Sequence, residues 1–282
     1  MKLLGEVLKL STQYLKEKEV SSPRLVAELL LAHVLKLQRI DLYMRFECPL
    51  EEFEIAELRS YIRRAACFEP VQYIIGKVEF YGCSLCVSSD VLIPRPETEI
   101  LVDKAAKLLE KEDLFGKNLA DICSGSGCIG ISLKKKFPEL SVYVSDKSEE
   151  ALAICRKNIE NNGVPVTVFS GDLLDPFIGT KIDYVFCNPP YISYREYEEL
   201  HPSVKSYEPK MALVGGEDGL VFYERLAKDL PLYLASQGKV FLEIGTGQGD
   251  MLYKIFSDPC WKKKEVSYDY GGHERFFFLE IE

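Results

Sequence analysis

The sequence of 282 residues contains only three histidines, His33, His201 and His273, and they lie far apart in the chain. Among nine cysteines only Cys83 and Cys86 form a C-x-x-C pair. No second pair or neighbouring histidine would complete a set of four zinc ligands, so we expect no metal site. An odd number of scattered cysteines indicates reduced thiols in a cytoplasmic protein, where they serve as small apolar residues.

Long apolar runs and basic tracts are also missing. No uncharged apolar run approaches the roughly 18 residues of a membrane span, and Glu6 and Lys9 interrupt the amino terminus, so we expect neither a span nor an export signal. The 35 Lys and Arg stand against 44 Asp and Glu, a formal net charge of −9. Residues 1–75 carry 11 of each sign, so the later residues hold the whole deficit. This charge argues against a general nucleic-acid or acidic-membrane binder.

What the chain does contain begins with helical patterns. With 47% hydrophobic residues it can bury a core. Ser22 followed by Pro23 is typical of an N-cap and a first-turn proline. Apolar spacing predicts helices over Leu3–Leu15, Leu25–Leu37 and Leu50–Cys67. We interpret residues 1–75 as a small helical domain that docks a macromolecular substrate.

Residues 76–96 are interpreted as a linker. Lys77–Tyr81 and Cys83–Ser88 flank Gly82 and predict a β-hairpin. The following stretch, Ile93–Glu99, contains two prolines, and its acidic residues fall in the first turn of a helix that runs to about Lys111. From the residues alone this stretch can be a plain connection or part of a site.

Strands and helices alternate from Asn118 onward, which is typical of a doubly wound α/β sheet. The first predicted strand, Leu119–Cys123, turns through Ser124-Gly125-Ser126-Gly127 into a helix over Cys128–Phe137. Glycines at that point let a ligand approach the backbone at a helix amino terminus. We therefore interpret residues 97–282 as a cofactor-binding catalytic domain.

Acidic residues follow the next two predicted strands. Ser141–Ser145 ends at Asp146, about 20 residues after the glycines, where a carboxylate can accept the two hydroxyls of a ribose. Val166–Phe169 ends near Gly171-Asp172, which places a second carboxylate where an adenine amino group can be bound. Three strand ends thus converge on one nucleoside-like ligand.

The fourth strand, Ile182–Cys187, runs into Asn188-Pro189-Pro190-Tyr191. The prolines fix φ and lack N–H groups, so the loop is stiff and rich in acceptors. The Asn188 oxygen and the Pro189 carbonyl can accept both hydrogens of a planar NH2 group, whose nitrogen is then aimed in one direction. No general base is needed, because an alkylated nitrogen is acidic, and Tyr191 would offer a ring face. The alternative is that these residues form only a turn.

A second glycine-rich turn, Gly245-Thr246-Gly247-Gln248-Gly249, follows a predicted strand over Lys239–Ile244 and precedes an acid, Asp269. Only one helix and an antiparallel hairpin, over Glu265–Tyr270 and Arg275–Ile281, are predicted after it. No counterpart of the Asn188 loop follows. We therefore assign the cofactor to the first glycine turn and a packing role to the second.

Together these motifs resemble the S-adenosylmethionine-dependent methyltransferases, and more closely the release factor glutamine methyltransferases. The resemblance extends over most of the chain and rests on several blocks in order. They are the helical amino-terminal domain, Phe80-Tyr81-Gly82, Ile93–Glu99, Gly125–Ile129, Asn188–Ile192, Glu208-Pro209, Gly215–Leu220, Glu243-Ile244-Gly245, Gln248-Gly249 and Gly272–Arg275.

The resemblance implies a seven-stranded Rossmann-like sheet and methylation of the side-chain amide nitrogen, N5, of the Gly-Gly-Gln glutamine in peptide chain release factors. S-Adenosylmethionine would be the donor and S-adenosylhomocysteine the product. It further implies these roles: Cys123, Ser124, Gly125, Ser126 and Gly127 at the methionine part, Asp146 at the ribose, Asp172 and Leu173 at the adenine, and Asn188, Pro189, Pro190 and Tyr191 at the glutamine. Asn188 would also contact the cofactor. Ile93–Glu99 would close over the cofactor. We expect a monomer.

Two residues depart from the family pattern, which commonly has Gly at the position of Cys123 and in some members Trp at that of Leu173. Both changes bear on cofactor affinity, so a non-catalytic binding protein is one competing hypothesis. N6-adenine methylation of DNA or RNA is another, since a flipped adenine presents a similar NH2 group. The acidic balance argues against nucleic acid.

Overall fold

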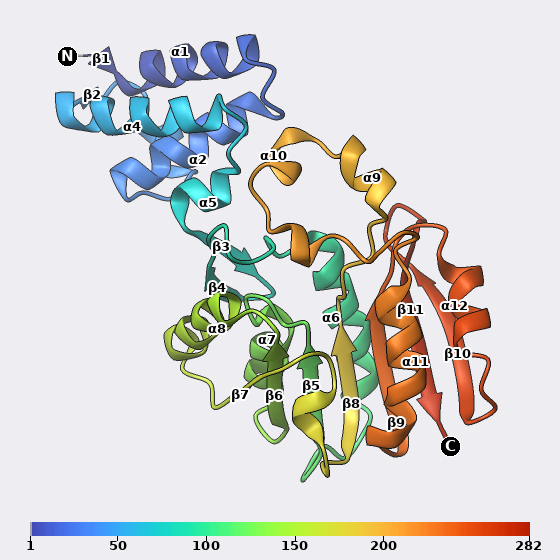
Figure 1. Cartoon of the computed structure of the whole chain (residues 1–282). Coiled ribbons are helices and arrows are strands. Elements are labelled where there is room, and N and C mark those ends of the chain that lie inside the picture. Colours follow the sequence, from blue (N-terminus) through green and yellow to red (C-terminus); the bar gives the residue numbers. More distant parts are fainter. Residues whose placement is uncertain (1) are drawn as a thin grey trace. The chain divides into compact units, whose positions relative to one another are not determined.

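The computed structural model describes residues 2–282, which form two compact units. One unit comprises the residues up to Lys77 together with His201–Tyr207, and the other comprises Val78–Leu200 and Glu208–Glu282. The sequence predicted a boundary near residue 75 but did not predict that the short segment 201–207 would belong to the first unit. Figure 1 labels the elements.

The first unit is helical. Its elements are β1 (Lys2–Leu3), α1 (Leu4–Glu17), α2 (Pro23–Leu35), α3 (Asp41–Met44), β2 (Pro49–Leu50), α4 (Glu52–Ala65), α5 (Val71–Ile75) and, from the later segment, α10 (Pro202–Lys205). Leu3 and Leu50, expected inside helices, instead lie in the short antiparallel pair β1–β2. Ser22 does precede α2, but its φ of 50° is left-handed and its side chain makes no capping hydrogen bond. The predicted N-cap position of Ser22 and the first-turn position of Pro23 are nevertheless confirmed.

Apolar faces of α1, α2 and α4 make the core of this unit, with Leu15, Leu30 and Leu31 fully buried. The segment 201–207 is held by the Tyr207 hydroxyl, which donates to the Cys67 carbonyl at 2.8 Å. Within residues 2–282, no helix combines the length and the apolar character needed to cross a bilayer.

The second unit contains a seven-stranded sheet in the order β10-β11-β9-β8-β5-β6-β7. Its strands are β5 (Asn118–Ile122), β6 (Ser141–Asp146), β7 (Thr167–Ser170), β8 (Ile182–Cys187), β9 (Leu234–Glu243), β10 (Trp261–Tyr268) and β11 (Glu274–Ile281). Only the terminal hairpin β10–β11 introduces antiparallel pairing. The Rossmann-like sheet and its terminal hairpin confirm the predicted fold class. The hairpin β3 (Lys77–Phe80) and β4 (Cys83–Cys86) forms a separate two-stranded sheet.

Helices cover both faces of the large sheet (Figure 1). The α-helices of this unit are α6 (Pro96–Leu109), α7 (Cys128–Lys136), α8 (Glu149–Asn162), α9 (Tyr194–Glu199), α11 (Val221–Tyr233) and α12 (Gly249–Ile255). Two single 3-10 turns, η1 (Asp175–Phe177) and η2 (Lys210–Ala212), complete it. One apolar layer lies under α6 and α7, and the other under α11 and α12. Strands buried on both faces explain the near-continuous apolar sequence of β8.

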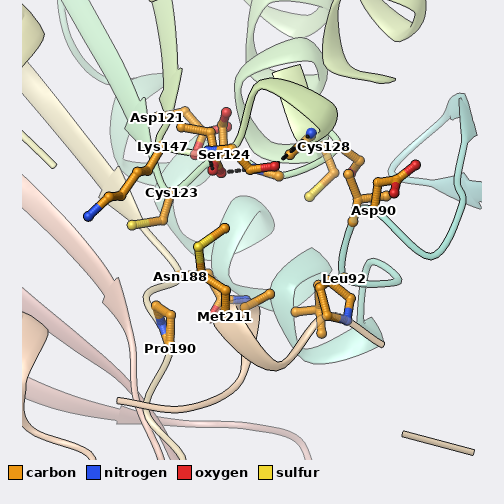
Figure 2. Close-up of a pocket in the computed structure, with 18 of the residues that line it drawn as sticks. Asp90, Leu92, Asp121, Cys123, Ser124, Cys128, Lys147, Asn188, Pro190 and Met211 are labelled. Carbon is orange, nitrogen blue, oxygen red and sulfur yellow. Dashed lines mark hydrogen bonds between the residues drawn. The ribbon is translucent and has the colours of Figure 1, made fainter. Parts of the chain in front are cut away.

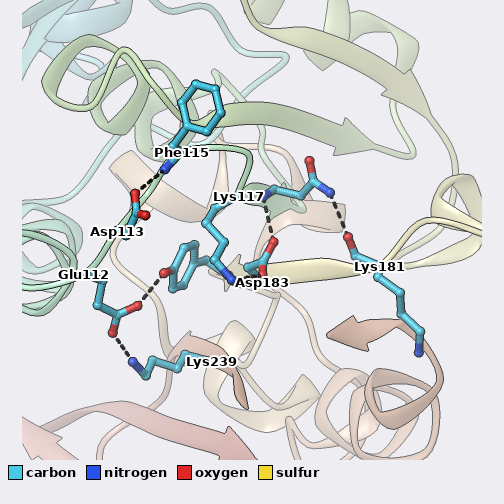
Figure 3. Close-up of polar contacts among 9 residues, drawn as sticks. Glu112, Asp113, Phe115, Lys117, Lys181, Asp183 and Lys239 are labelled. Carbon is cyan, nitrogen blue, oxygen red and sulfur yellow. Dashed lines mark hydrogen bonds and ion pairs between the residues drawn. The ribbon is translucent and has the colours of Figure 1, made fainter. Parts of the chain in front are cut away.

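Polar contacts tie the central strands together (Figure 3). The Asp183 carboxylate accepts from Lys117 Nζ and from the Asn118 amide, each at 2.9 Å, and so joins the beginnings of β5 and β8. In a second set of contacts, Glu112 accepts from the Tyr184 hydroxyl and from Lys239 Nζ and so joins β8 to β9. The central strands are thereby fixed relative to one another on the side away from their carboxyl ends.

Pairing of β5 with β8 positions the candidate site. The two strands are parallel neighbours, and Ile122 lies opposite Cys187 in register. The next residues along the chain are Cys123 and Asn188, so the glycine turn and the Asn-Pro-Pro-Tyr loop leave the sheet side by side. Ligands of open α/β sheets bind at this edge, beyond the carboxyl ends of the strands.

Candidate active site

A cavity of ≈ 400 Å³ opens at the carboxyl ends of β5 to β8. This volume lies within the range of small-molecule sites, roughly 300–1,000 Å³. The predicted residues on its wall are Cys123, Ser124, Gly125, Ser126, Asp146, Asp172, Leu173, Asn188 and Pro190. Gly127, Pro189 and Tyr191, also predicted as site residues, do not lie on the wall. Figure 2 shows Asp121, Cys123 and Ser124 across the cavity from Asn188, Pro190 and Met211.

The glycine turn bends tightly after β5. Cys123 has a φ of 57° and Gly125 a φ of 52°, both in the left-handed region. The Gly125 amide donates to Asp146 Oδ2 at 2.8 Å, and the Ser148 amide donates to Oδ1 at 3.0 Å. Each carboxylate oxygen keeps a further lone pair. Asp146 can therefore accept ligand hydroxyls while it holds the turn in place.

Asp121, in β5, is a wall residue that the sequence reasoning did not single out. It is 1% exposed; its Oδ2 accepts from the Gly130 amide at 2.9 Å, whereas its Oδ1 has no hydrogen-bond partner. Burial raises the pKa of Asp121 to about 7. A buried carboxylate oxygen without a partner is costly unless a ligand supplies a positive charge or a donor. An acid two residues before the turn was the available signal in the sequence.

Asp172 lies on the wall after β7, but its carboxylate already has partners. Lys147 Nζ lies 3.2 Å from Oδ2, and Arg225 Nη1 lies 3.2 Å from Oδ1. Burial raises the pKa of Asp172, but hydrogen bonds and charges from Arg225 and Lys147 outweigh it and lower the pKa overall. The neighbouring Leu173 is buried, with a φ of 52°. Leu173 thus gives the wall apolar surface beside an ion-paired acid.

Asn188 is oriented by a hydroxyl from α6. Its Nδ2 donates to Thr98 Oγ1 at 3.3 Å, and Thr98 in turn donates to Glu243 Oε2 at 2.6 Å. Thr98 lies on the cavity wall beside Asn188. Since the NH2 group is engaged with Thr98, Asn188 Oδ1 is the atom left to accept from a ligand.

Two glycines and a glutamine hold the loop from behind. A Cβ on Gly215 would lie 2.3 Å from the Pro190 carbonyl oxygen, and one on Gly219 would lie 2.1 Å from the Tyr191 carbonyl oxygen. Gln248 Nε2 donates to that same Tyr191 oxygen at 3.1 Å, while its Oε1 accepts from the Gly245 amide at 2.8 Å. The loop backbone is therefore packed and hydrogen-bonded on its far side.

These contacts define the role of the second glycine-rich turn. No residue of 245–249 lies on the cavity wall, and Gln248 instead holds the Asn-Pro-Pro-Tyr loop. Asp269 accepts from the backbone amides of Gly271 and His273 within its own hairpin. The predicted packing role of this turn agrees with these contacts.

The Tyr191 hydroxyl points toward Glu243, whose Oε1 lies 3.4 Å away. Burial, and then the charge of Glu243, raise the pKa of Tyr191. A ring face for the ligand, as the sequence predicted for Tyr191, is not part of the cavity wall in this structure.

An ion pair holds the segment Ile93–Glu99, of which Pro94, Arg95 and Thr98 lie on the cavity wall. Arg95 Nη2 lies 2.6 Å from Glu208 Oε1, and the Ile93 amide donates to Glu208 Oε2 at 3.3 Å. The Glu208 side chain is 1% exposed. The segment is thus joined to Pro209 and Met211, which lie on the same wall.

Two family models match the chain. The PrmC N-terminal domain matches residues 6–76, and the methyltransferase small domain matches residues 98–203. Among curated relatives, the release factor glutamine methyltransferase of Geobacter sulfurreducens is 39% identical over 272 residues, covering 96% of this chain and 94% of its own. The release factor glutamine methyltransferase of Bacillus subtilis is 38% identical over 286 residues, covering 98% of this chain and 96% of its own.

Solved structures share the fold at low identity. The hMettl16 catalytic domain, in complex with MAT2A 3′UTR hairpin 6, has a TM-score of 0.55 at 17% identity and covers 71% of this chain and 76% of its own. The T. thermophilus 16S rRNA N2 G1207 methyltransferase, in complex with AdoMet and guanosine, has a TM-score of 0.50 at 15% identity and covers 73% of this chain and 50% of its own. At this identity the likeness concerns the fold alone.

Proposed function

The chain belongs to the release factor glutamine methyltransferase family, and on that premise we propose that it methylates N5 of the glutamine in the Gly-Gly-Gln motif of peptide chain release factors. The observation that carries the proposal is that one cavity is lined both by the glycine turn and by Asn188, whose side-chain oxygen is free to accept. Methyl donor and amide acceptor would meet there.

The wall residues fit S-adenosylmethionine, which would supply a sulfonium methyl group. The unpartnered Asp121 Oδ1 suits the positive charge of this donor, and Cys123 to Ser126, which lie on the wall, would follow its methionine part. Asp146 retains lone pairs for ribose hydroxyls. Leu173 would cover the adenine, and Asp172 would take the adenine amino group with the lone pairs that its ion pairs leave free.

Asn188 and Pro189 would orient the acceptor. The Asn188 oxygen, on the cavity wall, would accept one hydrogen of the glutamine NH2 group, and the carbonyl of Pro189, a residue off the wall, would accept the other, so that the nitrogen faces the donor. These acceptors also stabilise the positive charge that grows on the nitrogen during attack. The methylated nitrogen then loses a proton to water, and no side-chain base is required.

The test compares Asn188→Ala with the wild type in a methyl-transfer assay with intact release factor. We expect kcat to fall by roughly 10²- to 10³-fold, the usual cost of losing one preorganised hydrogen bond, while the Kd of S-adenosylmethionine changes little. Asn161→Ala, on the exposed face of α8, is the matched control. Equal losses of transfer and cofactor binding would show that Asn188 supports the cofactor instead.

The rival acceptor, an adenine amino group in DNA or RNA, is separated in the same assay. Labelled donor is offered with release factor or with an oligonucleotide, and we expect label in the protein only. The chain carries a net charge of −9, which weakens binding to phosphate backbones. Because release factors act in translation termination, we propose a cytoplasmic enzyme, and a monomer remains our expectation. Transfer to the oligonucleotide alone would contradict the proposed substrate.

A further inference from the structure

We propose that Glu243 is a positioning residue for this reaction: acting through the Thr98 hydroxyl, it holds the Asn188 amide with its oxygen toward the cavity. This role rests on the proposed function, because only the oxygen of Asn188, and not its NH2 group, can accept from a substrate amide nitrogen. An asparagine side chain is nearly symmetric in shape. Its neighbours must therefore decide which atom faces the substrate.

The directions of the hydrogen bonds determine which atom of the Asn188 amide faces the substrate. Thr98 has one hydroxyl proton and donates it to Glu243 Oε2 at 2.6 Å. An ionised carboxylate only accepts, so this proton is committed to Glu243. Thr98 can then offer Asn188 only a lone pair, to which Asn188 Nδ2 donates at 3.3 Å. Asn188 Oδ1 is left for the cavity.

Because Thr98 and Glu243 are buried, water cannot replace either of them as a hydrogen-bond partner. Thr98 is 2% exposed and Glu243 is 1% exposed, so solvent does not reach the middle of the chain of hydrogen bonds. Turning the Asn188 amide over would set Oδ1 against a hydroxyl oxygen whose proton is engaged elsewhere. That arrangement brings two acceptors together and leaves them unpaired, which is unfavourable in a buried place.

Glu243, at the end of β9, is itself positioned by one contact of its side chain and one hydrogen bond to its main chain. Its Oε1 lies 3.4 Å from the Tyr191 hydroxyl, and its main-chain carbonyl accepts from the Tyr223 hydroxyl at 2.8 Å. Thr98 comes from α6, which packs on β9. We call the chain of hydrogen bonds from Glu243 through Thr98 to Asn188 the relay. It forms only where α6, β9 and the end of β8 meet in the folded unit.

The charge state of Glu243 controls the relay. The groups that face it are Thr98 and Glu97 on α6, Tyr191 after β8 and Arg275 on β11. Burial is the largest influence, and it raises the pKa of Glu243 to about 7 although Thr98 and Arg275 oppose it. A protonated Glu243 gains a donor and can donate to Thr98, whose proton can then turn to Asn188 Oδ1. Methyl transfer should therefore decline as pH falls through about 7.

Four proteins test this in steady-state assays with release factor: the wild type, Glu243→Gln, Thr98→Val and Thr98→Ser. We expect kcat/KM to fall roughly 10- to 100-fold in the Gln and Val variants, the size expected for the loss of one hydrogen bond to a charged group away from the reacting atoms. Thr98→Ser should recover most of the activity lost in Thr98→Val. With S-adenosylmethionine at saturation, the decline at low pH should disappear in Glu243→Gln. Calorimetry should find the Kd of S-adenosylmethionine little changed in this variant, since Glu243 is not on the wall.

Ser132→Ala is the matched control, because Ser132 is a buried hydroxyl of α7 that contacts Cys83 Sγ and lies off the wall. Its kinetics should equal those of the wild type. Should Glu243→Gln fail to fold, the Thr98→Val and Thr98→Ser pair decides. Wild-type kinetics in Thr98→Val, or cofactor binding that weakens as much as transfer, would overturn the positioning role.

A second readout does not depend on activity. The ¹⁵N side-chain amide signal of Asn188 should titrate near pH 7 in the wild type and lose that titration in Glu243→Gln. Identical titration in both proteins would defeat the positioning role. A wild type that gives this titration but transfers no methyl to release factor would instead defeat the proposed function alone.

Discussion

Cys123 combines an unfavourable backbone conformation with a place on the cavity wall. Its φ of 57° is left-handed, where a side chain costs roughly 1–2 kcal/mol. Glycine adopts this conformation without that cost, so the backbone at this position favours glycine over cysteine. The Cys123 thiol also touches the thiol of Cys187, whose pKa is raised by burial and then by this contact.

Cys123→Gly should therefore bind S-adenosylmethionine a few-fold more tightly, because it widens the approach to the glycine turn and removes the strain. Global stability should change by less than about 1 kcal/mol, since glycine also gains entropy in the unfolded chain. Isothermal titration and urea unfolding measure the two quantities. Cys123→Ala keeps the Cβ while removing the sulfur, so equal affinity gains in both variants would contradict the role assigned to the backbone.

Asp121 makes stability depend on pH. Its folded pKa is raised from 3.8 to about 7, so its stabilising contribution is complete below the unfolded value and is lost as pH rises through about 7. Asp121→Asn lacks this titration. Without cofactor, the difference in the free energy of unfolding between the variant and the wild type should shift by roughly 2–3 kcal/mol in favour of the variant from pH 5 to pH 8. Urea unfolding at both pH values measures this free energy, and Asp175→Asn, at an exposed position, serves as the control. If the stability difference between Asp121→Asn and the wild type were the same at both pH values, the linkage would be refuted.

At the scale of elements, the sequence predicted those whose pattern is strong and local. The apolar run of β8, the glycine turn into α7 and the acids in the first turn of α6 are each visible in a few consecutive residues. Short pieces such as α3, α5 and α10 lack such a pattern and were not predicted. The relay from Glu243 through Thr98 to Asn188 joins residues 145 and 90 positions apart, so no local pattern could indicate it. The hydrogen bond from Gln248 to the Tyr191 carbonyl joins residues 57 positions apart, so the sequence did not indicate it either.

The Asn-Pro-Pro-Tyr loop depends on close packing by glycine, which a matched pair of variants can test. Gly219 and Gly247 have φ of 79° and 82°, so alanine is strained at both. Only at Gly219 would the Cβ collide, 2.1 Å from the Tyr191 carbonyl oxygen; at Gly247 nothing lies within 4 Å. Gly219→Ala must therefore displace the loop, and Gly247→Ala need not.

We expect kcat/KM to fall at least tenfold further in Gly219→Ala than in Gly247→Ala, because a misplacement of about 1 Å can cost on the order of 10²-fold in rate. The assay is methyl transfer to release factor, with cofactor affinity measured in parallel. A similar loss in the two variants would mean that backbone strain alone, and not contact with the loop, accounts for the effect.

At the scale of the whole molecule, each unit has a hydrophobic core of its own. Leu15, Leu30 and Leu31 belong to the first, while Phe186 and Phe241 belong to the second. The cavity is lined only by residues of the second unit. A ligand that binds the folded state stabilises the cooperative unit that contains its site, by RT ln(1 + [L]/Kd).

Differential scanning calorimetry should accordingly resolve two transitions, of which S-adenosylmethionine moves only one. At a concentration 100 times its Kd the ligand contributes about 2.7 kcal/mol, which corresponds to roughly 5–10 °C in Tm for a unit of this size. Leu30→Ala, a buried core residue of the first unit, should lower the other transition and leave the ligand-induced shift intact. If the ligand raised both transitions equally, or if Leu30→Ala lowered both, the two units would unfold as one and the separate cores would not define separate cooperative units.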